Sequence, residues 1–160
     1  MSRRDRFRKG AVALLILIIL AVACRRSPAS PEPSPTPPPD LQAHLDRGQE
    51  FLEQENLPEA IREFEAALQI DPNSVAAHFR LGNAYTQGGR LAEAEEQFKA
   101  ALRLDPQSGD AHSNLGVVYY EQGRFDEAVK EFKEALKLLP NDPEILYNLG
   151  GVYVQQNKLD

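Results

Sequence analysis

Three histidines have the widest range of possible chemistry in this chain, and they are evenly spaced: His44, His78 and His112 lie 34 residues apart. An imidazole can bind a metal ion or act as a general base. Three ligands of one zinc ion would have to converge to within about 2.1 Å of it. Residues at equal positions of successive helical units are instead separated by about 8–10 Å, the distance between packed helices. We therefore interpret the histidines as packing residues and predict neither a metal site nor a cofactor.

Nucleophilic chemistry has no better support. His112 and Ser113 are neighbours, but adjacent residues of a helix point in different directions, and no third group is placed to orient the histidine. The chain has a single cysteine, Cys24, and no pattern typical of a glycine-rich phosphate loop or a pair of catalytic carboxylates. We predict that the protein is not an enzyme.

Charge excludes one class of partner. Residues 41–160 hold 11 lysines and arginines against 21 aspartates and glutamates, a net charge of −10. Nucleic-acid binding needs a basic surface, which this part of the chain lacks. We predict no nucleic-acid partner.

Two stretches, residues 76–106 and 110–140, carry the same small, aromatic and proline residues in the same order, 34 residues apart. The matched pairs are Gly82/Gly116, Tyr85/Tyr119, Gly89/Gly123, Ala94/Ala128, Phe98/Phe132, Ala101/Ala135 and Pro106/Pro140. A period of this length, carried by two helical patterns and a closing proline, resembles the tetratricopeptide repeat. The resemblance implies an all-α fold, an α-solenoid of about three and a half helix-turn-helix repeats.

The expected repeats are residues 41–74, 75–108 and 109–142, with the first helix of a fourth at 143–160. Ser74, Ser108 and Asp142 are predicted N-caps of first helices. Gly89 and Gly123 are predicted to end first helices, because glycine adopts a left-handed backbone at little cost.

The two ends of the array diverge from this pattern. In the first repeat, Arg47 stands where the others have leucine, and Glu55 stands in place of a glycine. A terminal repeat faces water on one side, so polar residues are expected there. In the fourth unit no second helix follows within residues 143–160, so the apolar face of its first helix is predicted to be exposed and prone to association.

The first 23 residues are predicted to be a signal peptide, in which basic residues precede an apolar run from Ala11 to Ala23. At about 1.5 Å per residue the run covers about 20 Å, less than the roughly 30 Å hydrocarbon core of a bilayer. The small residues before Cys24 resemble a bacterial lipobox, although Ala21 stands where leucine is usual. The resemblance implies a lipidated Cys24 that anchors the protein in a membrane of the bacterial cell envelope, facing the periplasm or the exterior. The alternatives are an unmodified cysteine and a single N-terminal signal anchor.

Residues 24–40 are predicted to be a disordered tether. Seven of the twelve prolines lie between residues 25 and 40. Proline-rich chain favours polyproline II at about 3.1 Å per residue, so the tether could hold the repeats up to about 50 Å from the bilayer. A proline-motif ligand for a recognition domain is the alternative.

The resemblance also implies a concave groove lined by first helices. The predicted peptide- or protein-binding residues are Phe79, Asn83, Gln87, Asn114, Val117, Tyr120, Tyr147 and Asn148. Phe79, Tyr120 and Tyr147 are interpreted as apolar anchors outside the repeat-defining core. An asparagine side chain can both donate and accept, so Asn114 and Asn148 are expected to pair with an extended peptide backbone. The alternative is that they satisfy neighbouring turns.

Chaperone-binding members of this family hold a terminal carboxylate with lysine, asparagine and arginine. The corresponding places here are held by Leu45, Gln49, Arg80, Asp110 and Asn114. Because Asp110 would repel a carboxylate, we predict no binding of chaperone C-terminal tails.

The sequence thus predicts a non-catalytic, membrane-tethered scaffold or adaptor that binds a peptide or protein partner in its groove. The alternative is a structural cell-envelope protein that self-associates, as a possible homo-oligomer, through its uncovered C-terminal helix. Lipoproteins with such repeats include pilus-assembly pilotins and cell-envelope scaffolds, and nothing in these residues chooses between them.

Overall fold

The computed structural model describes residues 39–156, and within this range the protein consists of seven α-helices without a strand. They are α2 (Pro39–Glu53), α3 (Leu57–Ile70), α4 (Val75–Gln87), α5 (Leu91–Leu104), α6 (Gly109–Glu121), α7 (Phe125–Leu138) and α8 (Pro143–Gln155). The predicted all-α fold is confirmed. None of these helices is long and apolar enough to cross a bilayer. The predicted signal peptide, Cys24 and residues 157–160 lie outside the described residues.

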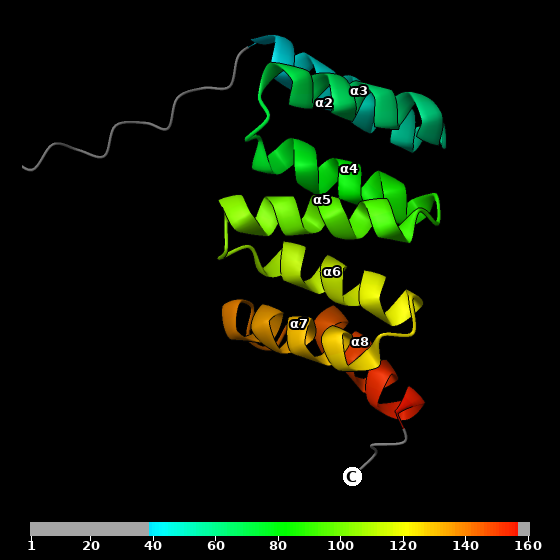
Figure 1. Ribbon diagram of the computed structural model, residues 1–160, viewed down its shortest axis with the longest axis vertical. Helices are drawn as coiled ribbons and strands as arrows, with labels where there is room; N and C mark the ends of the chain where they lie inside the picture. Colours follow the sequence, from blue (N-terminus) through cyan, green and yellow to red (C-terminus); the bar gives the residue numbers. More distant parts are fainter. Residues whose placement is uncertain (1–38, 157–160) are drawn as a thin grey trace, which may run out of the picture. The chain divides into compact units, whose positions relative to one another are not determined.

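Consecutive helices pair as hairpins, and the hairpins stack one after another (Figure 1). α2 packs on α3, α4 on α5 and α6 on α7, and the second helix of each pair also packs on the first helix of the next. First helices contact each other as well, α2 with α4, α4 with α6 and α6 with α8. The first helices therefore form a continuous row that can present one shared surface.

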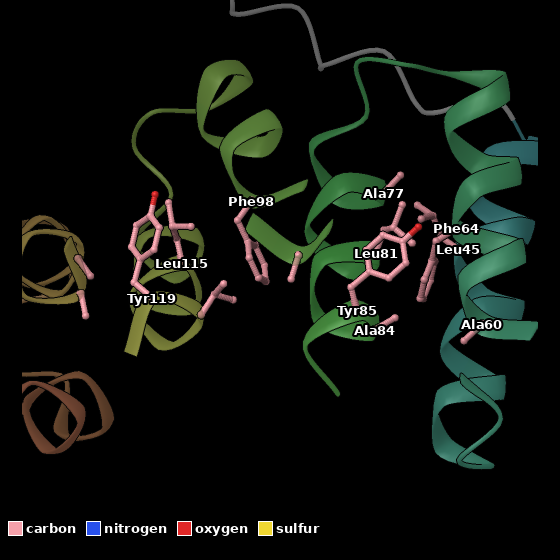
Figure 2. Close-up of a cluster of buried hydrophobic side chains, with 14 of the residues drawn as sticks. Leu45, Ala60, Phe64, Ala77, Leu81, Ala84, Tyr85, Phe98, Leu115 and Tyr119 are labelled. Carbon is pink, nitrogen blue, oxygen red and sulfur yellow. The ribbon is translucent and has the colours of Figure 1, made fainter. Parts of the chain in front are cut away.

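Each complete hairpin is closed by a glycine on its first helix and a phenylalanine on its second. The pairs are Gly48 with Phe64, Gly82 with Phe98 and Gly116 with Phe132. A Cβ atom added to Gly82 or Gly116 would lie 2.8 Å from the ring of its partner, so only glycine lets the two helices approach this closely. All three rings are at most 1% exposed. In Figure 2, Leu81 and Tyr85 extend from α4 toward Phe64, within the same buried cluster.

The turns follow the predicted chemistry. Ser74 and Ser108 accept hydrogen bonds from the backbone nitrogens of Ala77 and Ala111, both at 3.2 Å, and Asp142 caps α8 in the same way. The three predicted N-caps are confirmed. Gly89 and Gly123 have φ angles of +68° and +74°, the left-handed backbone that ends the first helices.

The first hairpin departs from the others in three places. α2 begins at Pro39, two residues before the expected start of the first repeat, and so includes the end of the predicted tether. Proline has a fixed φ that suits the beginning of a helix. Arg47 is exposed and donates a hydrogen bond to Glu63 of α3 over 3.0 Å, which explains a polar residue at a position that is apolar elsewhere. Glu55 adopts a φ of +58° where the later hairpins have glycine.

Candidate peptide-binding groove

A groove of about 410 Å³ runs across the first helices of the three complete hairpins. Its lining comes from α2, α4 and α6, and consists of Gln49, Leu52, Glu53, Asn83, Thr86, Gln87, Asn114 and Val117. The structure therefore brings together four of the predicted binding residues, Asn83 and Gln87 of α4 and Asn114 and Val117 of α6.

Two asparagines are joined in this groove. The side-chain nitrogen of Asn114 on α6 donates a hydrogen bond to Oδ1 of Asn83 on α4 over 2.7 Å. No protein hydrogen bond within residues 39–156 uses the side-chain nitrogen of Asn83 or the side-chain oxygen of Asn114. The side-chain nitrogen of Asn83 thus remains as a donor for a ligand and the side-chain oxygen of Asn114 as an acceptor, and each residue of an extended peptide backbone can match both.

A second hollow of about 720 Å³ adjoins the groove and shares Val117 with it. It lies between α6 and α8, and its lining includes Tyr120, Tyr147 and Asn148, the remaining predicted residues apart from Phe79. Tyr147 is 81% exposed, which leaves nearly the whole ring available for contact. The polar groove therefore continues into an apolar and aromatic one.

The lining of both hollows carries carboxylates and no lysine or arginine. Glu53 lies in the groove and Glu121 in the second hollow. Asp110, Asp142 and Glu144 line a smaller depression beside Asn114. The local potential is therefore negative, and an acidic ligand would be repelled.

Sequence profiles of the tetratricopeptide repeat match three overlapping parts of the chain, residues 45–109, 89–132 and 118–157. Together they cover the described helices almost without remainder. The chain belongs to the tetratricopeptide-repeat family. Tetratricopeptide repeats are in general interaction modules that carry no catalytic groups of their own, and within residues 39–156 no group of three or more His, Cys, Asp or Glu side chains is placed to hold a metal ion.

Solved structures share this tetratricopeptide-repeat fold. The first such domain of Spaghetti (RPAP3), determined with the HSP90 peptide SRMEEVD, has a TM-score of 0.72 and 22% identity, over 74% of this chain and 94% of that one. MamA has a TM-score of 0.71 and 21% identity, over 74% of this chain and 69% of that one. PilF of Pseudomonas aeruginosa has a TM-score of 0.68 and 30% identity, over 74% of this chain and 55% of that one. A search of curated protein sequences found no match.

Two of the three aromatic residues predicted to stand outside the core of the tetratricopeptide repeats lie beside it and pack against it. Phe79 meets Phe98 edge-on, with ring centroids 5.9 Å apart, and lines neither hollow. Tyr120 packs on Phe125 at 5.8 Å, although it also lines the second hollow. Both residues are partly buried against the core without being part of it, because each also packs on the second helix of its own hairpin. Tyr147 lacks such a neighbour among the described ring contacts.

The histidines of the tetratricopeptide repeats form a recurring polar pair that the sequence interpretation missed. In each hairpin the Nδ1 atom of the histidine lies 2.7–2.8 Å from the residue 19 positions later. The pairs are His44 with Glu63, His78 with Gln97 and His112 with Glu131. Burial alone would raise the pKa of the Glu63 carboxyl, but hydrogen bonds from His44 and Arg47 outweigh it and hold that pKa below its usual value. The signal was present in the sequence, because Glu, Gln and Glu recur with the same 34-residue period as the histidines.

Proposed function

We propose that this protein is a non-catalytic adaptor that binds an extended segment of a partner protein across its first helices. The observation that carries the proposal is the hydrogen bond between Asn83 and Asn114 inside a groove built from three helices. The free donor and acceptor of this pair bind the peptide backbone, and Leu52, Val117 and Tyr147 contact its apolar side chains. Such a site binds the backbone of the peptide at its centre and the apolar side chains of the peptide at its ends.

The partner segment is neutral or basic. Glu53 and Glu121 line the two hollows, and the lining contains no cation. One peptide-bound neighbour, the first such domain of Spaghetti (RPAP3), was solved with a peptide that ends in Glu-Glu-Val-Asp. It supports peptide binding by this fold, whereas the acidic lining here favours a ligand of different charge.

We further propose that lipidation of Cys24 anchors the adaptor to a membrane of the cell envelope. Acyl chains contribute about 0.8 kcal/mol for each buried methylene, and two or more chains give lasting attachment. The test is fractionation and fatty-acid labelling of the wild type and of Cys24→Ser. The variant should lose the label and leave the membrane fraction; a variant that keeps both contradicts the lipid anchor.

The groove is tested by site-specific crosslinking in the native cell, from Gln87 and Tyr147, with the exposed Glu96 of α5 as the control position. We expect one partner to be captured from both groove positions and not from Glu96. Capture of the same proteins from all three positions, or of none from the groove, contradicts the proposal.

A second candidate function is self-association through α8, favoured by the exposure of Leu146 (49%), Tyr147 (81%) and Val154 (51%). Light scattering across a range of concentrations decides it. A dimer that dissociates when Tyr147 is changed to Glu supports self-association, and a monomer at all concentrations excludes it.

A further inference from the structure

A small depression lies beside the groove, between the first halves of α6 and α8. Its volume is about 70 Å³, against about 410 Å³ for the groove. Its lining comes from α6 and from the cap and first turn of α8, and consists of Asp110, Ser113, Asn114, Asp142, Glu144 and Ile145. Three of these residues carry carboxylates, and none carries a positive charge. We call these six residues the acidic depression.

Two positions of the repeat change at the acidic depression. Phe79 and Arg80 of α4 have Ser113 and Asn114 as their counterparts 34 residues later on α6. Phe79 packs edge-on against Phe98, and Arg80 donates a hydrogen bond to a backbone oxygen of α2. A serine leaves open much of the space that a phenylalanine fills at this position, and the asparagine brings no positive charge. The sequence of α6 therefore makes a hollow here that is both unfilled and negative.

The hydroxyl of Ser113 indicates that the acidic depression takes a polar ligand. Ser113 is only 8% exposed, and no hydrogen bond within residues 39–156 uses its hydroxyl. Thr86 on α4, by contrast, donates a hydrogen bond to the backbone oxygen of Gly82, one turn earlier in the helix. A buried hydroxyl without a partner is unfavourable, so a ligand that bonds to Ser113 satisfies a group that the fold leaves unsatisfied.

The three carboxylates of the acidic depression have no cation among the residues that the structure describes. Asp110, Asp142 and Glu144 form no ion pair within residues 39–156. One oxygen of Asp142 caps α8, because it accepts hydrogen bonds from the backbone nitrogens of Glu144 and Ile145. The other oxygen of Asp142 and both other carboxylates remain for a ligand. Such a group of unpaired carboxylates attracts a cation.

The arrangement suits an ammonium group better than a metal ion or a guanidinium. Calcium needs oxygen ligands that converge to about 2.3–2.6 Å from one point. No group of three or more His, Cys, Asp or Glu side chains is so placed in the described part of the chain. A lysine ammonium has three donors that point in different directions, and it can join oxygens that do not converge. A guanidinium is planar and pairs best with a carboxylate in its own plane.

We propose that the acidic depression binds the ammonium group of a lysine in the partner segment and so determines which segments the groove selects. The inference rests on the proposed function, because the groove presents the lysine. Asn114 lines both the groove and the depression, so a residue whose backbone N–H donates to the oxygen of Asn114 has its side chain at the edge of the depression. The ammonium donates hydrogen bonds to Ser113, Asp110 and Glu144. The joined asparagines give affinity for any extended backbone, and the depression adds specificity.

The first measurement separates the acidic depression from the groove. The full chain is titrated with Nα-acetyl-lysine N-methylamide while the backbone amide signals are followed by nuclear magnetic resonance. We expect the signals of Asp110, Ser113 and Glu144 to shift with saturation at millimolar concentration. The norleucine and arginine analogues should cause smaller shifts at the same concentration. Equal shifts with lysine and norleucine, or with lysine and arginine, would overturn the ammonium site.

The second measurement uses a library of octapeptides with acetylated and amidated ends, in which one position at a time is fixed as lysine, arginine, glutamine or norleucine. The immobilised full chain should bind lysine at one position about 10-fold more tightly than glutamine. Two variants should lower this preference to less than about 2-fold. Ser113→Phe fills the depression with the residue that α4 has at this position, and the double variant Asp110→Asn, Glu144→Gln removes two of its carboxylates.

The control removes two exposed carboxylates elsewhere, in the double variant Glu50→Gln, Glu96→Gln. It should keep the full preference for lysine. An equal loss in the control would mean that the net charge of the chain attracts lysine, and would overturn the proposal. Circular dichroism checks that Ser113→Phe is folded. The Asp110, Glu144 double variant changes only exposed side chains and tests the site independently.

Failure of this inference differs from failure of the proposed function. If peptides bind through Asn83 and Asn114 without selecting lysine, the lysine site is wrong and the groove remains. If lysine amide shifts the signal of Ser113 but no peptide of the library binds, the groove is wrong. Two further results would overturn the lysine site. One is binding of peptides with a free amino terminus and no lysine, and the other is saturable binding of calcium that Ser113→Phe abolishes.

Discussion

The side-chain nitrogen of Asn114 lies 2.7 Å from Oδ1 of Asn83 and donates a hydrogen bond to it, joining α6 to α4 inside the groove. A hydrogen bond between two neutral side chains stabilises a fold by only about 0.5–1.5 kcal/mol. Its larger consequence is orientation, since each amide holds the other in place and leaves the side-chain nitrogen of Asn83 and the side-chain oxygen of Asn114 for a ligand. A site whose polar groups are fixed in advance loses less entropy on binding.

Glycine-to-alanine changes at Gly116 and Gly150 should have opposite effects on stability. At Gly116 the new Cβ lies 2.8 Å from the buried ring of Phe132, so we expect a loss of about 1–3 kcal/mol in the free energy of unfolding. At Gly150 the Cβ meets nothing, and the higher helix propensity of alanine should add up to about 1 kcal/mol. Urea unfolding followed by circular dichroism measures both. Losses of equal size would show that Gly150 is covered in solution.

Changing Glu55 to glycine should stabilise the protein. Glu55 has a φ of +58°, in the position where the later hairpins have Gly89 and Gly123. A side chain in the left-handed region costs about 1–2 kcal/mol, part of which glycine loses again through its freedom in the unfolded chain. We expect a net gain of about 0.5–1 kcal/mol in urea unfolding. Asn141→Gly, at φ +68°, is the control and should gain less, because asparagine tolerates this backbone. If Glu55→Gly does not raise the free energy of unfolding, the left-handed backbone at Glu55 is not strained.

Glu95 should make the stability of the array sensitive to acid. Burial alone would raise its pKa, but hydrogen bonds from Lys99 and Gln122 and the charge of Arg124 hold the folded pKa below the usual value of 4.5. The folded state therefore binds fewer protons than the unfolded state. The resulting stabilisation is complete above about pH 4.5 and is lost as the pH falls through the lower folded pKa.

Glu95→Gln should lower the free energy of unfolding by about 1–2 kcal/mol at pH 7 and flatten the decline below pH 4.5. Melting temperatures between pH 7 and pH 3 measure this. Glu96→Gln, an exposed change on the same helix, should leave the profile unaltered. An equally steep acid decline in both variants would place the sensitivity elsewhere.

Acidic chaperone tails should not bind the groove. Arg80 donates a hydrogen bond to the backbone oxygen of Leu45 at 3.3 Å, and Glu53 and Asp110 line the adjoining surfaces. A peptide ending in Glu-Glu-Val-Asp would place further carboxylates next to Glu53 and Asp110, which would repel them. Fluorescence anisotropy with a labelled peptide should show no saturation at concentrations where a neutral or basic peptide saturates. Saturable binding of the acidic peptide would contradict the charge assigned to the groove.

Much of the fold was predictable because the same capping, turn and packing residues recur at the same positions of each repeat. Ser74, Ser108 and Asp142 precede their helices at equal spacing, and each one caps as expected. Gly82 recurs as Gly116 and Phe98 recurs as Phe132, so two separate parts of the sequence predict the same close crossing of the helices. The start of α2 at Pro39 was missed. No repeat precedes the first one to show where its first helix should begin, and a proline is as common in a linker as at the start of a helix.

The site was harder to predict than the fold. The position of a residue in a helix predicts which way its side chain points, but not how much of the side chain is exposed. The exposed fraction depends on which neighbouring element fills the adjacent space. Phe79 and Tyr147 occupy equivalent positions on α4 and α8, yet Phe79 packs on Phe98 whereas Tyr147 is 81% exposed. The difference comes from α5, which covers α4, while no described helix covers α8 in the same way.

The central claim is that an extended peptide binds across α4 and α6 at the joined asparagines. The most direct test is a nuclear magnetic resonance titration of the full chain with the segment that crosslinks to Gln87 and Tyr147, observing the side-chain amide signals of Asn83 and Asn114. We predict that both signals shift with saturation and that the Asn83→Ala, Asn114→Ala double variant, still folded, no longer binds. Unchanged asparagine signals together with shifts confined to α3, α5 and α7 would contradict the claim.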